Sequence, residues 1–67
     1  MLVSNVRAAR LAAGLTQEEL SRRCHVSRQT IISIERGAHA PTLMLALVLA
    51  RELDQRVDSL FTLEGAP

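Results

Sequence analysis

Polar side chains gather at the start of one short predicted helix, residues 28–36. Arg28 and Gln29 open this helix, Thr30 follows, and Ser33 lies one turn further along. Arginine and glutamine side chains each offer two hydrogen-bonding atoms, which match the edges of guanine and adenine in the major groove of DNA. The amide groups at a helix N-terminus also attract phosphate. These residue types in this order predict contact with DNA bases; the alternative is that they are ordinary solvated residues at a helix start.

Residue combinations typical of enzymes and metal sites are missing from the sequence. Cys24 is the only cysteine, and its neighbour His25 does not stand at the spacing of paired metal ligands. No strained elbow, glycine-rich phosphate loop or oxyanion-hole motif accompanies the serines. Cys24 is more typical of a small buried hydrophobic residue. We therefore expect no enzymatic activity, no metal and no other cofactor.

Length and composition predict one small domain with an aliphatic core. The chain has 67 residues, of which 48% are hydrophobic, and Phe61 is its only aromatic residue. This length favours a single domain over residues 1–67, with a core at residues 5–61 and a tail at residues 62–67. No apolar run approaches the roughly 18 residues of a membrane span. A lone cysteine fits a reducing compartment, so we expect a cytoplasmic protein with no membrane partner.

The net charge of +1 conceals an uneven distribution. Residues 1–37 contain six arginines and three acidic residues, whereas residues 38–67 contain two arginines and four acidic residues. A basic half followed by an acidic half indicates two faces with different partners. The basic half is the one that contains the predicted DNA-reading side chains.

Capping signals divide the chain into short helices. Thr16 and Glu19 have the spacing of a capping box, and Ser27 and Thr42 are good N-caps for the helices that follow them. The sequence contains no strand-like alternation, so we predict an all-α, compact fold of five helices. The helices are expected at residues 4–13, 16–24, 28–36, 43–53 and 57–61.

The second and third predicted helices are joined by a very short connection around His25 and Val26. Such a connection does not let two helices lie antiparallel, so they are expected to cross steeply as in a helix-turn-helix. Ile31 and Ile34 fall on one side of the third helix, away from the polar side chains at its start. The third helix is therefore predicted to pack through one face and to present Arg28 on the other.

Four spaced blocks of the sequence resemble the Cro/cI-type helix-turn-helix regulators, a family also called lambda-repressor-like or Xre-like. The blocks are Thr16-Gln17-Glu18-Glu19-Leu20, Val26-Ser27-Arg28-Gln29-Thr30-Ile31, Ile34-Glu35-Arg36-Gly37 and Pro41-Thr42-Leu43. The resemblance implies a sequence-specific transcriptional regulator, a repressor, that binds a palindromic operator in double-stranded DNA as a homodimer. An alternative on the same fold is an antitoxin-type module that binds a partner protein.

The resemblance also implies roles for individual residues. Arg28 and Gln29 correspond to a base-reading pair, and Ser33 to a third base contact. Arg10 and Glu35 resemble a structural ion pair between the first and third helices. Phosphate contacts are implied for Gln17, Ser27, Thr30 and Arg36.

Four positions depart from the family pattern, and one of them is Cys24, which stands where an aliphatic residue is common. His25 stands where glycine is usual at the end of the second helix, and histidine tolerates left-handed backbone better than most residues. Ile32 stands where serine is common, so it either touches a thymine methyl group or weakens the polar contact surface. Ala38 stands where a basic residue is frequent, so a single subunit is expected to bind DNA weakly.

The fourth predicted helix is apolar on more than one side. Leu43, Leu47 and Ala50 form one stripe that is expected to face the core, and three further leucines widen it. Met44 and Val48 fall beside this stripe. They either pack beneath the C-terminal tail or take part in a subunit interface.

An exposed apolar patch usually has a partner, which favours the interface. We expect a homodimer in which the fourth helix, the fifth helix and the tail take part, through Met44, Val48, Phe61 and Leu63. Leu11, on the first predicted helix, is a further apolar residue to which the sequence assigns no contact.

Overall fold

Hydroxyl side chains fix the starts of the three central helices. The computed structural model describes residues 1–65. In it Thr16, Ser27 and Thr42 each accept a hydrogen bond from the backbone N–H three residues further on, at 3.0, 3.1 and 3.1 Å. Glu19 completes the capping box by accepting the N–H of Thr16 at 3.0 Å. The predicted caps are confirmed, and the helices that follow them are α2 (Gln17–Cys24), α3 (Arg28–Glu35) and α4 (Leu43–Leu53).

The five predicted helices are present, but the all-α description is only approximate because a two-stranded ribbon joins the two ends of the described chain. Strand β1 (Leu2–Ser4) pairs antiparallel with β2 (Phe61–Leu63), with Val3 opposite Thr62. The first helix, α1, therefore spans Val6–Ala12 and begins two residues later than expected. The short helix α5 ends one residue early, at Leu60, where β2 takes over.

The two strands of the ribbon were not predicted because each is only three residues long. A strand this short does not show a clear period-2 alternation of hydrophobic and polar residues. Its pairing also joins opposite ends of the chain, where no local turn announces it. Thr62 and Leu63, which were expected in an irregular tail, belong to β2. Residues 66–67 of that tail lie outside the described residues.

The core is aliphatic and draws on all five helices. Its fully buried side chains come from α1, α2, α3, α4 and α5 and are Val6, Leu20, Ile31, Ile34, Leu49 and Leu60. Full burial of one such side chain contributes about 1.5–3 kcal/mol. Phe61 lies only partly buried against this cluster, and Cys24 is buried within it.

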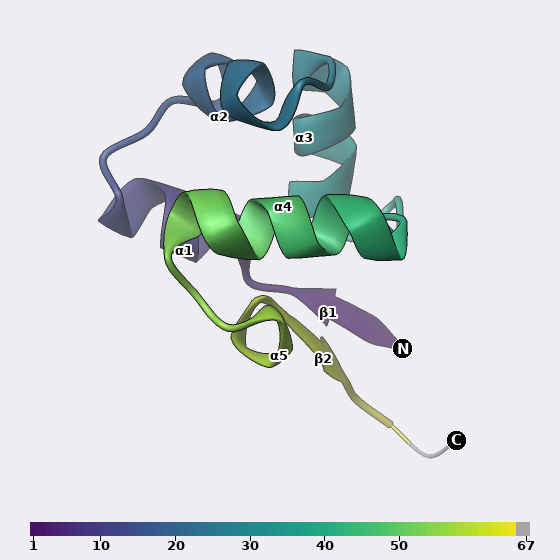
Figure 1. Cartoon of the computed structure of the whole chain (residues 1–67). Helices are drawn as coiled ribbons and strands as arrows, with labels where there is room; N and C mark the ends of the chain where they lie inside the picture. The colour runs from purple at the N-terminus through teal and green to yellow at the C-terminus, as the bar shows by residue number, and fades with distance from the viewer. Residues whose placement is uncertain (66–67) are drawn as a thin grey trace.

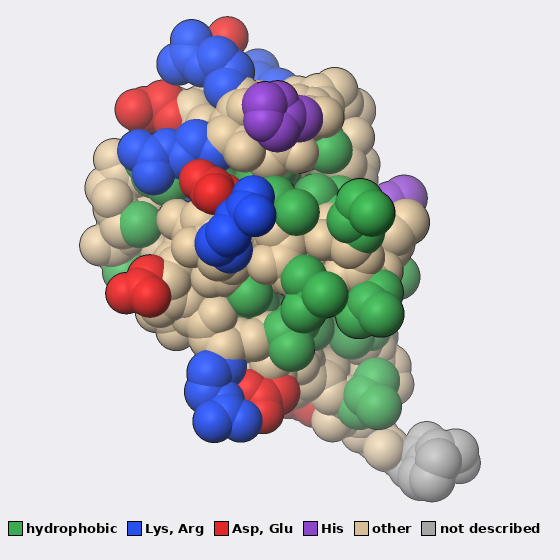
Figure 2. Space-filling view, in the orientation of Figure 1, with side chains coloured by type: hydrophobic (Ala, Val, Ile, Leu, Met, Phe, Trp, Pro, Cys, Tyr) green, Lys and Arg blue, Asp and Glu red, His purple; other side chains and the backbone are tan. Residues whose placement is uncertain are grey.

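The face of α4 that packs on the core differs from the expected one. Leu49 and Leu53 are buried with Ala46, whereas Leu43 and Leu47 are exposed. Because leucine and methionine occur all round this helix, its pattern does not single out one face. Figure 2 shows the result as a group of hydrophobic side chains over α4. We call the residues Leu43, Met44, Leu47 and Val48 the outer face of α4.

Helix α4 lies between two parts of the molecule (Figure 1). Helices α2 and α3 lie on one side of it, and α5 and the β-ribbon lie on the other. The most extensive contact between helices joins α2 to α3, and α4 packs against both α2 and α5. Within residues 1–65, none of the helices has the length and apolar character needed to cross a membrane.

Candidate nucleic-acid interface

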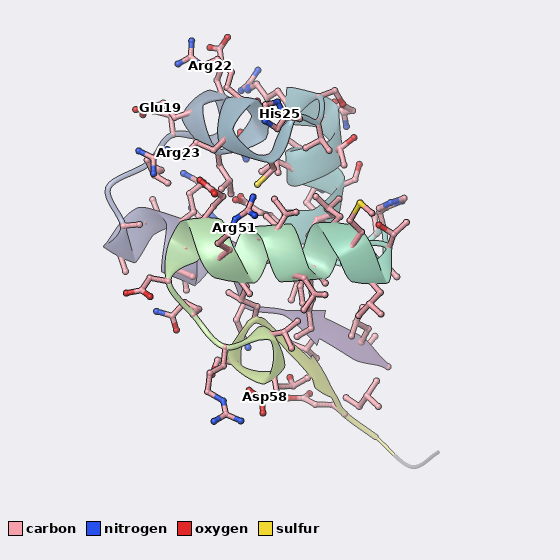
Figure 3. The ribbon with its side chains drawn as sticks, viewed as in Figure 1. Glu19, Arg22, Arg23, His25, Arg51 and Asp58 are labelled. Atoms are coloured by element: carbon pink, nitrogen blue, oxygen red, sulfur yellow. The ribbon has the colours of Figure 1, made fainter. Side chains whose placement is uncertain are left out.

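A three-residue connection sets the angle between α2 and α3. His25, labelled at the end of α2 in Figure 3, has left-handed backbone with φ 56° and ψ 41°, a conformation that histidine was expected to tolerate. Val26 then donates its N–H to the carbonyl of Ser21 at 3.1 Å and turns the chain. Ser27 starts α3 directly afterwards. The two helices consequently cross steeply, as Figure 1 shows, in the geometry of a helix-turn-helix.

The first turn of α3 presents its polar side chains outward. Arg28 and Gln29 are exposed, whereas Ile31 and Ile34 are fully buried on the opposite side of the helix. Packing of the two isoleucines fixes the rotation of α3 about its axis. The polar face is therefore directed outward by the core, which is the arrangement that a helix entering a major groove requires.

Arg10 and Glu35 form a buried ion pair behind this face. Arg10 Nε lies 2.6 Å from Glu35 Oε2, and Arg10 Nη2 donates to Glu35 Oε1 at 3.1 Å. The two side chains are 9% and 3% exposed. Arg10 Nη1 also donates to the carbonyl of Leu15 at 2.9 Å. The hydrogen bond to Glu35 raises the pKa of Arg10 above its ordinary value, so the guanidinium stays charged despite its burial.

Gln17 connects this buried pair to the outer surface. Its Nε2 donates to Glu35 Oε1 at 3.2 Å. Its Oε1 accepts a long hydrogen bond from Arg28 Nη2 at 3.5 Å. The structure therefore brings together Arg10, Gln17, Arg28 and Glu35, which come from three different helices.

The remaining candidate residues are spread along α3. The Ser27 hydroxyl caps the helix and also lies 2.9 Å from the Thr30 hydroxyl. Ser33 is partly buried one turn further on. Arg36 is exposed at the other end of the helix, about 12 Å along the axis from Arg28 at 1.5 Å per residue. Gln17 and Arg28 line a common groove, and Arg36 does not line it.

A groove at the start of α2 contains a residue that the sequence analysis missed. It has a volume of about 700 Å³, and Arg7 lines it beside Gln17 and Arg28. Leu11, which had no predicted contact, lines the same groove. Arg7 stands three residues before Arg10, so helical spacing places it on the same side of α1. This spacing is the signal in the sequence from which Arg7 could have been predicted.

Ile32 and Ala38, the two departures beside the contact surface, differ in burial. Ile32 is partly buried, and Ala38 is exposed in the loop after α3. Cys24 is buried, and this burial raises the pKa of its thiol. In the part of the chain that the structure describes, no three histidine, cysteine or acidic side chains gather as metal ligands would.

The comparisons with known proteins agree with this geometry. The family model described as "Helix-turn-helix" matches residues 6–60. The chain belongs to this family, in its Xre-like, Cro/cI-type class, as the four sequence blocks indicated. It is a transcriptional regulator with a helix-turn-helix DNA-binding domain.

Similar proteins come from both archaea and bacteria. An uncharacterized HTH-type transcriptional regulator of Methanothermobacter thermautotrophicus is 45% identical over 60 residues, which cover 88% of this chain and 87% of that protein. The uncharacterized HTH-type transcriptional regulator YgzD of Bacillus subtilis is 34% identical over 61 residues, covering 91% of this chain and 92% of YgzD.

Among solved structures, the restriction-modification controller protein C.AhdI from Aeromonas hydrophila is similar in fold. It superimposes with a TM-score of 0.73 at 35% identity, over 78% of this chain and 79% of C.AhdI. A hypothetical transcription factor from Neisseria has the same TM-score of 0.73 at 30% identity, over 79% of this chain and 60% of its own.

Proposed function

We propose that this protein is a repressor that recognises a palindromic operator as a homodimer. Helix α3 enters the major groove, where Arg28 and Gln29 read base edges and Ser33 makes a third contact. Each well-formed bidentate contact contributes about 1–3 kcal/mol of discrimination between bases. Bound across a promoter, the dimer would exclude other proteins from the DNA.

The observation that carries this proposal is the exposure of Arg28 and Gln29 on a helix whose other side is fixed in the core. Side chains on a rigid helix need little rearrangement to meet a rigid duplex. Contacts with phosphate would supply most of the affinity and place α3 in register. The residues proposed for these contacts are Gln17, Ser27, Thr30 and Arg36, together with Arg7 in the groove beside Gln17.

The proposed dimer forms through the outer face of α4. Leu43, Met44 and Leu47 are 74%, 77% and 53% exposed, an unusual concentration of apolar surface on a small domain. Leu63 is also exposed, at 83%, and adds a second apolar side chain on β2 to the proposed interface. Phe61 is partly buried and lines a groove together with Leu43, a residue of the outer face.

Size and charge favour a second copy of the chain as the partner. A standard interface buries about 800 Å² per partner, roughly a sixth of the 4580 Å² surface. Arg51 at the edge of the outer face is paired with Glu52 at 3.3 Å. The face therefore carries no unbalanced charge to repel an identical one. In such a dimer two copies of α3 would enter successive major grooves about 34 Å apart.

Selection of bound sequences from a random pool of duplex DNA tests this proposal. We expect enrichment of a palindromic motif with half-sites about one helical turn apart. The matched variant Arg28→Ala should retain the fold and lose preference at one base pair of each half-site. Recovery of unrelated sequences by the wild-type protein would contradict sequence-specific binding.

A protein-interaction module is the second candidate, and the apolar outer face of α4 favours it. Under that alternative the face would bind a different protein, as in an antitoxin. The mass in solution, measured by light scattering, distinguishes the two candidate functions, because the proposed homodimer has twice the mass of the chain. A strictly monomeric protein that enriches no DNA sequence would favour the second candidate.

A further inference from the structure

We infer that Glu35, besides pairing with Arg10, positions the two side chains Gln17 and Arg28 for reading DNA. This inference rests on the proposed function, since it concerns how the same surface is prepared for its operator. It assigns a positioning role to a residue that is itself sealed from solvent, with a side chain 3% exposed.

Both oxygens of Glu35 accept hydrogen bonds from its neighbours. Oε2 accepts from Arg10 Nε at 2.6 Å, and Oε1 accepts from Arg10 Nη2 at 3.1 Å and from Gln17 Nε2 at 3.2 Å. A buried carboxylate is stable only when its lone pairs meet donors. The amino group of Gln17 is therefore held against Glu35 by the need to satisfy that carboxylate.

This contact determines the orientation of the whole Gln17 amide. A glutamine amide has a donor end and an acceptor end. With Nε2 directed at Glu35, Oε1 faces the opposite way, where Arg28 Nη2 lies 3.5 Å from it. The flipped amide would place its oxygen against the carboxylate and its amino group against the guanidinium. Both contacts would be repulsive, so the charge of Glu35 selects the orientation that attracts Arg28.

The arrangement leaves the groups needed for DNA free. Gln17 Nε2 has a second hydrogen, which remains for a phosphate oxygen. Arg28 uses one of its five N–H donors on Gln17 and keeps the others for a base edge. A side chain already held near its bound position loses less conformational entropy on binding. Glu35 thus acts on base reading through Gln17, without touching DNA.

Paired variants separate this role from a purely structural one. Arg10→Met with Glu35→Met removes the buried charges together, which proteins often tolerate without loss of stability. Arg10→Met with Glu35→Gln removes the charges too, and it keeps a side-chain carbonyl oxygen that can accept from Gln17. Comparing the two double variants separates the effect of the hydrogen-bond acceptor at position 35 from the effect of the buried ion pair.

The measurement is the affinity ratio between the selected operator and an operator changed at the base pair that Arg28→Ala identifies. Fluorescence anisotropy at fixed salt gives both affinities, and thermal melts show which variants are folded. The Glu35→Met pair should reduce the ratio at this base pair about five-fold or more, since a good bidentate contact provides discrimination of about five-fold or above. The Glu35→Gln pair should recover most of it. A folded Glu35→Met pair with the wild-type ratio would overturn the inference.

Gln17→Met provides a second route that leaves the Arg10–Glu35 pair intact. It should reduce the same ratio, because Arg28 then lacks its support. A uniform loss of affinity for all operators, with an unchanged ratio, would mean that Gln17 only contacts phosphate and would refute the positioning role. A wild-type protein without preference at any base pair would instead overturn the proposed function, and this inference with it.

Discussion

Arg10 and Glu35 tie α1 to the last turn of α3 through two hydrogen bonds, at 2.6 and 3.1 Å, in a site almost closed to water. Helix α3 is therefore fixed at its far end by a charge pair and along its length by Ile31 and Ile34. Because both charged groups are buried, the loss of either one would leave the other without a counter-ion inside the protein.

Removing one partner of this pair should destabilise the fold strongly. We expect Glu35→Ala to lower the free energy of unfolding by about 3–5 kcal/mol, since it leaves the Arg10 charge buried without a counter-ion. The double variant Arg10→Met with Glu35→Met should lie much closer to the wild type. Urea denaturation followed by circular dichroism measures both. A single variant that costs less than about 1 kcal/mol would show that the pair is not buried in solution.

Replacing the left-handed residue at the end of α2 should, by contrast, increase the stability of the fold. His25 has φ 56°, a conformation that costs roughly 1–2 kcal/mol for a residue with a side chain. His25→Gly should therefore raise the melting temperature, with a gain in stability of about 1 kcal/mol after the larger entropy loss of glycine. His25→Ala is the matched control, because alanine keeps the strain, and it should give no gain. Equal melting temperatures for the two variants would contradict the strain.

Changing the outer face of α4 should dissociate the proposed dimer. Met44→Glu with Leu47→Lys replaces two exposed apolar side chains, so the fold should remain while the mass in solution falls to that of one chain. Leu11→Lys is the control, because Leu11 is 55% exposed and lines the groove beside Gln17 rather than the outer face of α4. Light scattering at several concentrations provides the masses. Retention of the dimer by the α4 variant would place the interface elsewhere.

Cys24 should make the protein less stable at alkaline pH. Burial raises the pKa of its thiol above the ordinary value of 9.0, so the folded protein keeps the proton that the unfolded chain releases. This contribution is fully present below pH 9 and is lost as pH rises toward the folded value. The chain has no lysine and no tyrosine, so few other groups titrate in this range. Unfolding by urea at pH 8 and pH 10 should show a decrease for the wild type and a smaller one for Cys24→Val. Identical decreases would contradict the assignment.

Local signals predicted the central helices well, because their information lies within a few residues. Thr16, Ser27 and Thr42 each mark a helix start by a bond to a backbone amide three residues away. The β-ribbon could not be predicted in this way, since Val3 and Thr62 meet only after the whole chain has folded. The prediction of which side of α4 faces the core was also wrong, because leucine and methionine occur all round this helix.

The candidate site was predictable in part for the same reason. Exposure of Arg28 follows from the position of the isoleucines on its own helix, and the structure has that exposure. The contact between Gln17 and Glu35 depends on how three helices pack, and no spacing in the sequence indicates it. Arg7 could have been included from its helical spacing to Arg10. The DNA contacts themselves remain predictions.

The most direct test of the account is a titration of the isotopically labelled protein with its selected operator, followed by NMR. Chemical shift changes should concentrate at residues 27–33 and at Gln17, with the side-chain signals of Arg28 and Gln29 among the most affected. The core of α4 should change little. Changes restricted to α4 and the β-ribbon, with the start of α3 unaffected, would contradict the claim that α3 reads DNA.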